Sequence, residues 1–194
     1  MPPEAEKAFQ QAQERLRTGK TSEGVQALEQ AVTLFPNYFV AWNALGMEYL
    51  KQNEVAKAGP SFQRALAANK NSASARFGLG WSYYQAEKLD EAARELTEST
   101  KLNPRAAETF WFLGMTELER KQWTAAEQAF LAFQRLHPQQ DRPLVHLYLT
   151  SVYDARGRTG DAVRSLETYL KLVPEKDRTP KLKDLLAQLK KKLP

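Results

Sequence analysis

The chain contains no cysteine and only two histidines among its 194 residues. Without cysteine it can form neither disulfide bonds nor thiolate metal sites. The two imidazoles, His137 and His146, are too few for a metal cluster. No hydrophobic run approaches the ~18 residues of a membrane-spanning helix. We therefore expect no metal site and no transmembrane segment.

No charged and then apolar segment precedes Glu4, so we expect either that the protein is not exported or that a secretion leader has been removed. We expect a soluble protein, cytoplasmic by default, or periplasmic if a leader has been removed. The hydrophobic content of 42% is ample for a packed interior and excludes bulk disorder.

The net charge of +5 is concentrated at the C-terminal end, where residues 141–194 carry 12 basic and 7 acidic side chains. A basic end can contact nucleic acid or acidic lipid. The alternative is the solvated face of a terminal helix. We favour this alternative because no aromatic residues are interleaved with the lysines.

Prolines recur at a fixed spacing. Pro36 and Pro104 lie 68 residues apart, which is twice 34, and Lys70 occupies the halfway position. Pro138 and Pro174 continue the series at intervals of 34 and 36. A period in this range is typical of stacked helix pairs, which act by presenting a surface.

Within one period, apolar and small residues recur at helical spacing on a first helix and then on a second. Gly46, Gly80 and Gly114 occupy one shared position. Glycine inside a helix costs up to ~1 kcal/mol relative to alanine, so the recurrence indicates a close approach of helices. The period that begins at Phe39 carries Trp42, Leu45, Gly46, Tyr49, Ala58, Phe62 and Ala65.

These residues closely resemble the tetratricopeptide repeat, which has a bulky residue, Leu-Gly, Tyr, Ala, an aromatic, Ala and a closing Pro. The resemblance implies an all-α fold: a right-handed α-solenoid of about five antiparallel helix pairs plus a C-terminal capping helix. Residues 1–194 would form a single tetratricopeptide-repeat domain. The expected repeats are 5–38, 39–72, 73–106, 107–140 and 143–176, with the capping helix at 180–193.

Two departures from the pattern stand out. Gly59-Pro60 falls in the first turns of a second helix, where proline would bend or delay it. Asp141 and Arg142 form a two-residue insertion before the fifth repeat.

The expected capping helix opens with Thr179-Pro180, a capping residue followed by proline. A basic amphipathic helix could instead lie on a membrane. We favour a cap, because the last repeat would otherwise expose an apolar face. The apolar stripe consists of Leu182, Leu185, Leu186, Leu189 and Leu193.

The first helix of each repeat carries two stripes, roughly 150° apart. One belongs to the core. In tetratricopeptide repeats the other lines a concave groove, so the resemblance implies ligand contacts there and at its margin. The expected partner-binding residues are Asn43, Met47, Phe77, Trp81, Tyr84, Trp111, Phe112, Met115 and Tyr148.

Aromatic anchors dominate binding hot spots, at ~2 kcal/mol or more each. We expect Trp81 and Trp111 to face a ligand, whereas Trp42 and Trp123 pack between helices. The alternative is that the groove aromatics pack against the terminal helix or a second copy of the chain.

Some family members grip a peptide's C-terminal carboxylate with a clamp of Lys, Asn and Arg residues. The corresponding positions hold no basic clamp in any frame of three repeats, so we reject that mode. We expect instead an extended or helical segment with apolar anchors, and with positive charge near Glu108, Glu119 or Asp154.

Catalysis is not predicted. Gly78-Leu79-Gly80 lies mid-helix and lacks the third glycine and the lysine of a phosphate loop. His146 and Asp154 are two helical turns apart, and nearby hydroxyls lack a second supporting group. We expect no enzyme activity and no cofactor.

The sequence therefore predicts a non-catalytic adaptor that binds a protein or peptide partner in an apolar concave groove centred on the third and fourth repeats. The alternative is a self-associating scaffold that uses the same repeats for homo-oligomerisation. A third, weaker hypothesis is that the lysine-rich C-terminal end binds nucleic acid or acidic lipid.

Overall fold

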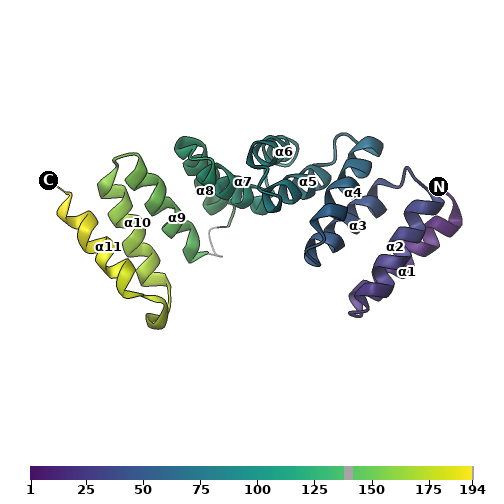
Figure 1. The fold of residues 1–194 in the computed structure, drawn as a ribbon, viewed down its shortest axis with the longest axis horizontal. Coiled ribbons are helices and arrows are strands. Elements are labelled where there is room, and N and C mark those ends of the chain that lie inside the picture. Colours follow the sequence, from purple (N-terminus) through teal and green to yellow (C-terminus); the bar gives the residue numbers. More distant parts are fainter. Residues whose placement is uncertain (138–141, 194) are drawn as a thin grey trace. The chain divides into compact units, whose positions relative to one another are not determined.

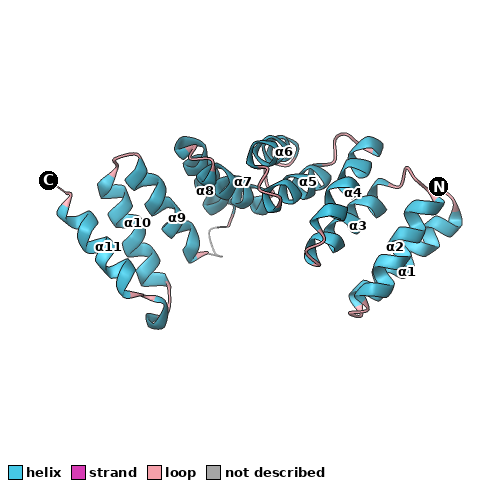
Figure 2. Ribbon diagram, viewed as in Figure 1, coloured by secondary structure: helices cyan, strands magenta, loops and turns pink. Residues whose placement is uncertain are grey.

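The computed structural model describes residues 1–137 and 142–193. In these ranges the regular structure is entirely helical (Figure 2), as predicted. The chain divides into two compact units, Met1–Pro104 and Arg105–Pro194, and each is described by itself. The assignment of 1–194 to a single domain stays a prediction.

Unit 1 contains three helix pairs (Figure 1). Within each pair the helices pack along one another, and each second helix also contacts the first helix of the next pair. A single apolar core runs through its first five helices. The helices are α1 (Pro3–Arg17), α2 (Thr21–Leu34), α3 (Phe39–Lys51), α4 (Val55–Ala68), α5 (Ala73–Gln85) and α6 (Leu89–Leu102).

Unit 2 contains two helix pairs followed by a short 3-10 turn and a last helix. It has its own core, to which every one of these α-helices contributes. The elements are α7 (Ala107–Glu119), α8 (Trp123–Leu136), α9 (Pro143–Ala155), α10 (Thr159–Leu172), the 3-10 helix Glu175–Asp177 and α11 (Pro180–Lys191).

The turn inside each pair has one recurring backbone feature. A residue with positive φ stands at the fifteenth position of every repeat, two residues before the second helix begins. L-residues pay a steric cost in this left-handed region, which glycine avoids. Two of the five positions hold glycine, so the turn geometry is kept even where the sequence does not favour it. The five residues are Gly19, Asn53, Glu87, Lys121 and Gly157.

The recurring glycines lie where helices approach closely, as predicted. A Cβ on Gly46 would come within 2.8 Å of the Phe62 ring, and one on Gly114 within 2.6 Å of the Phe130 ring. A Cβ on Gly78 would come within 2.2 Å of the same Phe62 ring. Gly78 therefore has a packing role, which accounts for the glycine pair that resembles part of a phosphate loop.

Pro60 does not delay its helix, contrary to one of the two expectations. Helix α4 begins at Val55, the same repeat position at which the other second helices begin, and Pro60 lies inside it. Because proline has no N–H, the carbonyl of Ala56 loses its usual donor four residues later.

Helix α11 caps unit 2 as expected. Leu189 is fully buried, and Leu182, Leu185 and Leu186 pack against the unit's core. Leu193 lies beyond the end of the helix and is exposed. Of the predicted insertion, Arg142 immediately precedes α9, whereas Asp141 lies outside the described residues.

Candidate functional site

The predicted partner-binding side chains lie on the first helices of the pairs, as the repeat register requires. In unit 1 these helices contact each other through α3 and α5, and in unit 2 through α7 and α9. We call the first set the α3/α5 face and the second the α7/α9 face. The α3/α5 face comprises Asn43, Met47, Phe77, Trp81 and Tyr84, and the α7/α9 face comprises Trp111, Phe112, Met115 and Tyr148.

Every side chain of the α3/α5 face is half-buried, so each keeps some accessible surface. Phe77 and Trp81, one helical turn apart, have ring centroids separated by 6.0 Å. Met47 and Trp81 also pack against the core of unit 1, which holds them in place. The result is a supported apolar surface, with Tyr84 one turn further along the same helix.

Asn43 adds a polar group to this face. Its Oδ1 atom is buried and finds no hydrogen-bond partner among the described residues. A buried amide oxygen without a partner carries a desolvation cost of roughly 1–3 kcal/mol.

Trp111 differs from the prediction, because it is only 7% exposed. Phe133 of α8 and Tyr148 of α9 converge on it, with ring centroids at 5.2 and 5.6 Å, and Phe130 lies at 6.1 Å. The expectation that Trp111 is an open aromatic anchor is wrong for this reason. Its ring belongs to the core of unit 2, and Phe112, Met115 and Tyr148 are the half-buried members of the α7/α9 face.

One contact on the α7/α9 face was not anticipated from the sequence. The guanidinium of Arg142 lies over Trp111, with Cζ 5.1 Å from the ring centroid, and 5.5 Å from that of Phe133. The same guanidinium donates a hydrogen bond from Nη2 to Glu108 Oε1 at 2.5 Å. Glu108 was expected to meet a positive charge from a partner, and here that charge comes from within the unit.

The other two tryptophans behave as predicted. The Trp42 indole donates to the carbonyl of Pro36 at 2.8 Å and packs against the core of unit 1. Trp123, the first residue of α8, packs against the core of unit 2.

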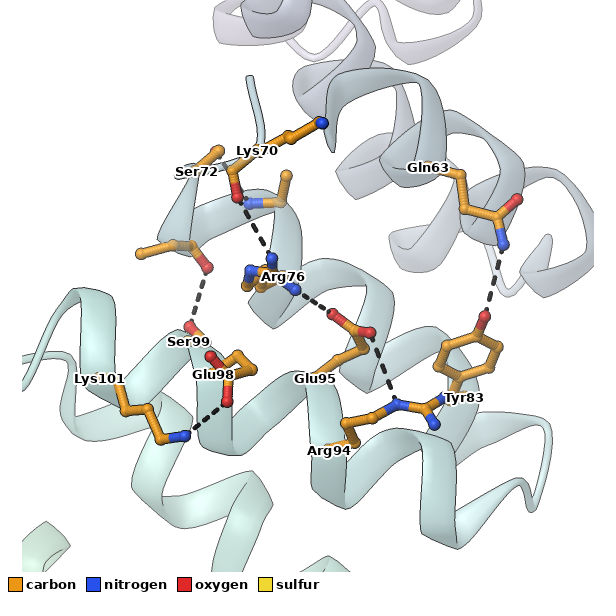
Figure 3. A network of polar contacts seen from close by, with 12 residues as sticks. Gln63, Lys70, Ser72, Arg76, Tyr83, Arg94, Glu95, Glu98, Ser99 and Lys101 are labelled. Carbon is orange, nitrogen blue, oxygen red and sulfur yellow. Dashed lines mark hydrogen bonds and ion pairs between the residues drawn. The ribbon is translucent and has the colours of Figure 1, made fainter. Parts of the chain in front are cut away.

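A network of polar contacts joins α5 to α6 (Figure 3). Arg76 of α5 donates from Nη1 to Glu95 of α6 at 2.8 Å and from Nη2 to the carbonyl of Lys70 at 3.3 Å. Ser99 of α6 donates to the carbonyl of Ala73 at 2.8 Å. These bonds hold α5, the helix that carries Phe77, Trp81 and Tyr84, against α6.

Unit 1 also contains an open cleft of about 430 Å³ between α2, α3 and α4. In it the Tyr49 hydroxyl donates to Glu29 at 2.6 Å, and the ammonium of Lys57 lies 5.3 Å from the Tyr49 ring centroid. Burial and the bond to Glu29 raise the pKa of Tyr49 well above its usual range. Tyr49 therefore stays protonated at neutral pH and cannot act as a general base.

Within residues 1–137 and 142–193, no group of three or more His, Cys, Asp or Glu side chains is placed to hold a metal ion. The Thr150 hydroxyl donates to the backbone carbonyl of His146 at 2.8 Å rather than to an imidazole. Asp154 accepts a bond from Lys192 at 3.1 Å. Among the helices of the described part, none is long and apolar enough to cross a bilayer.

Comparison with known proteins identifies the repeat. The family model described as "Tetratricopeptide repeat" matches residues 9–73, 43–96 and 77–141. Among curated proteins, the chain is 26% identical over 140 residues to anaphase-promoting complex subunit 6 of Arabidopsis thaliana. That match covers 72% of the chain but only 25% of the plant protein, so the chain spans about a quarter of this relative's length.

Solved structures agree on the fold. The chain superposes on the MamA protein with a TM-score of 0.79 at 18% identity, covering 88% of this chain and 92% of that one. It also superposes on YrrB, described as a TPR protein with an unusual peptide-binding site. For YrrB the TM-score is 0.76 at 18% identity, covering 96% of this chain and 91% of that one.

Proposed function

Because the chain belongs to the tetratricopeptide repeat family, we propose that it is a non-catalytic adaptor that binds a segment of a partner protein. Repeats of this family generally mediate protein–protein interaction. The partner segment would lie on the apolar faces of the first helices. The α3/α5 face would supply the aromatic anchors.

The observation that carries this proposal is the state of the aromatic side chains on α5. Phe77, Trp81 and Tyr84 follow one another at helical spacing, and all three keep accessible surface while the network that joins α5 to α6 holds the helix in place. Rigid aromatic side chains contribute large contact area at a low entropic cost, which is why they dominate hot spots. Met47 would extend the apolar contact, and the half-buried side chain of Asn43 would border it.

On the α7/α9 face, Phe112, Met115 and Tyr148 would contact the segment directly. Trp111 would support them from below, since its ring is part of the core. The α3/α5 face belongs to unit 1 and the α7/α9 face to unit 2, and each is proposed as a binding surface by itself.

The comparisons support a peptide as the class of ligand. YrrB, which shares the fold, is described as having a peptide-binding site, and the plant relative is a subunit of a multiprotein complex. Partner identity for this chain follows from neither, because the first likeness extends only to the fold and the second covers a quarter of the relative.

The test is capture of partner proteins by the immobilised chain, with Trp81→Ala as the variant. Losing an anchor of this kind should weaken capture at least ~10-fold. Leu102→Ala is the matched control, because Leu102 is an exposed apolar residue at the end of α6 and outside both faces. Equal capture by the wild type and a folded Trp81→Ala variant would refute the proposal.

Light scattering tests the remaining alternative, self-association. A dimer that is lost on Trp81→Ala would show that the α3/α5 face binds a second copy of the chain. A monomer at high micromolar concentration would leave the adaptor as the function of this face.

A further inference from the structure

A complete binding arrangement for a guanidinium group stands on the α7/α9 face. The carboxylate of Glu108 lies beside the rings of Trp111 and Phe133, and the guanidinium of Arg142 meets all three. Cations are attracted to aromatic faces at distances up to ~6 Å from the centroid. A carboxylate adds a charge-assisted hydrogen bond that orients the planar group. We call Glu108, Trp111 and Phe133 the arginine subsite.

An aromatic ring at this repeat position can be covered without a positive charge, as the equivalent residues of unit 1 show. Phe9 stands at the repeat position of Trp111, and Glu6 stands at that of Glu108. Tyr38 precedes α3 just as Arg142 precedes α9, and its ring centroid lies 5.1 Å from that of Phe9. An uncharged ring therefore covers Phe9 at the equivalent place.

The occupant of the subsite lies at the surface. The side chain of Arg142 is 45% exposed and that of Glu108 is 50% exposed. Ion pairs this open to water contribute little to stability, because solvent screens them and long side chains lose entropy when held. An external guanidinium can therefore replace Arg142 at small cost.

We propose that the arginine subsite receives an arginine side chain of the partner segment, and that Arg142 fills it until the segment binds. This rests on the proposed adaptor function and specifies the residue that the partner presents. Arginine fits better than lysine, because its planar group can stack on an aromatic ring while it bonds the carboxylate. The occupant seen in the unbound chain has the chemistry that the subsite selects.

The probe is N-acetyl-arginine amide, titrated into the full chain carrying Arg142→Ala and followed by NMR of the tryptophan indole groups. The Trp111 signal is assigned as the indole signal that disappears in a Trp111→Phe variant. We expect a saturable shift of that signal, with binding at least ~10-fold tighter than for N-acetyl-citrulline amide, the uncharged analogue. Adding Glu108→Gln should weaken binding ~10-fold by removing the charged acceptor. The wild type should bind more weakly than Arg142→Ala, because its own arginine competes.

Two results would overturn the inference: equal binding of the arginine and citrulline amides, or no shift of the Trp111 signal in a folded Arg142→Ala chain. If Arg142→Ala fails to fold, Arg142→Gln serves in its place, since it keeps most of the covering stem and lacks the charge. If the arginine amide does not bind but Trp81→Ala still weakens partner capture, only the arginine subsite is refuted. If the arginine amide binds but Trp81→Ala leaves partner capture unchanged, only the adaptor function of the α3/α5 face is refuted.

Discussion

The ring of Phe62 occupies the space that a side chain at Gly78 would need. Phe62 is fully buried in α4, and Gly46 of α3 borders the same ring. The absence of a side chain at both glycines thus lets an aromatic residue of α4 fill the space between α3 and α5.

Substitution of Gly78 by alanine tests this relationship. Overpacking of a rigid core commonly costs about 1–3 kcal/mol, and we expect Gly78→Ala to lower the free energy of unfolding by that amount. Chemical denaturation measures it. In a Phe62→Leu background the cost of Gly78→Ala should shrink, because the smaller side chain relieves the overlap. Equal costs in the two backgrounds would show that Phe62 does not set the requirement for glycine.

Gly19 and Gly59 form a matched pair for the turn geometry. A Cβ at either position would meet no atom within 4 Å, but only Gly19 has a positive φ. Gly19→Ala should therefore destabilise the chain by about 1–2 kcal/mol through the left-handed conformation. Gly59→Ala should cost less, because φ is not positive there and alanine has the higher helix propensity, which offsets the crowding of a Cβ by the following Pro60. Thermal melting of both variants compares the two costs, and an equal or larger loss for Gly59→Ala would contradict this explanation.

Arg76 and Glu95 form an ion pair at positions where the fourth repeat has Phe110 and Ala129. Their side chains are only 26% and 15% exposed. Glu95→Ala alone should destabilise by about 2 kcal/mol, because it leaves a largely buried arginine without its acceptor. The double change Arg76→Phe with Glu95→Ala recreates the pair of the fourth repeat. Its unfolding free energy should match or exceed that of the wild type, since well-packed apolar replacements of buried pairs are often neutral or stabilising. A double variant as unstable as the single one would contradict this.

The raised pKa of Tyr49 leads us to expect that the folded chain loses stability at alkaline pH. Burial raises its pKa, so the unfolded chain releases the proton first, at about pH 10, and stability falls as pH rises above that value. Burial also raises the pKa of Tyr38 and Tyr153, which contribute to the same fall. Tyr49→Phe should therefore make the fall shallower. Denaturation of both proteins at about pH 8 and about pH 11 measures it. Identical losses would show that Tyr49 contributes nothing.

Trp111→Ala should behave as a core truncation. We expect it to destabilise by about 3–5 kcal/mol, because Phe130, Phe133 and Tyr148 would lose their shared contact. Trp81→Ala should cost less, since Trp81 keeps accessible surface. Melting temperatures in the reverse order would restore Trp111 as an open anchor.

The repeat register could be read from the sequence with accuracy. The first helices of the last four pairs begin at Phe39, Ala73, Ala107 and Pro143, the residues at which the repeats were expected to start. The period fixes these positions because every pair must bury the same stripe against the next. The close approach at Gly46 and Gly114 followed from the same constraint.

The burial of Trp111 could not be predicted from that register. Periodicity shows which side of a helix a residue occupies, but coverage depends on particular neighbours. Phe133 on α8 and Arg142 in the short segment before α9 cover this ring, whereas Trp81 keeps accessible surface. Arg142 carried no signal of its role, because it stood in an insertion outside the repeat pattern.

The left-handed residue between paired helices recurs from Gly19 to Gly157, even where glutamate or lysine must adopt it. The turn keeps its geometry with such different side chains, although residues other than glycine pay a steric cost there. Gene duplication could therefore add or delete whole 34-residue segments without creating a new junction. A protein of this design can therefore change its length by whole repeats, and the turns inside the remaining repeats keep their geometry.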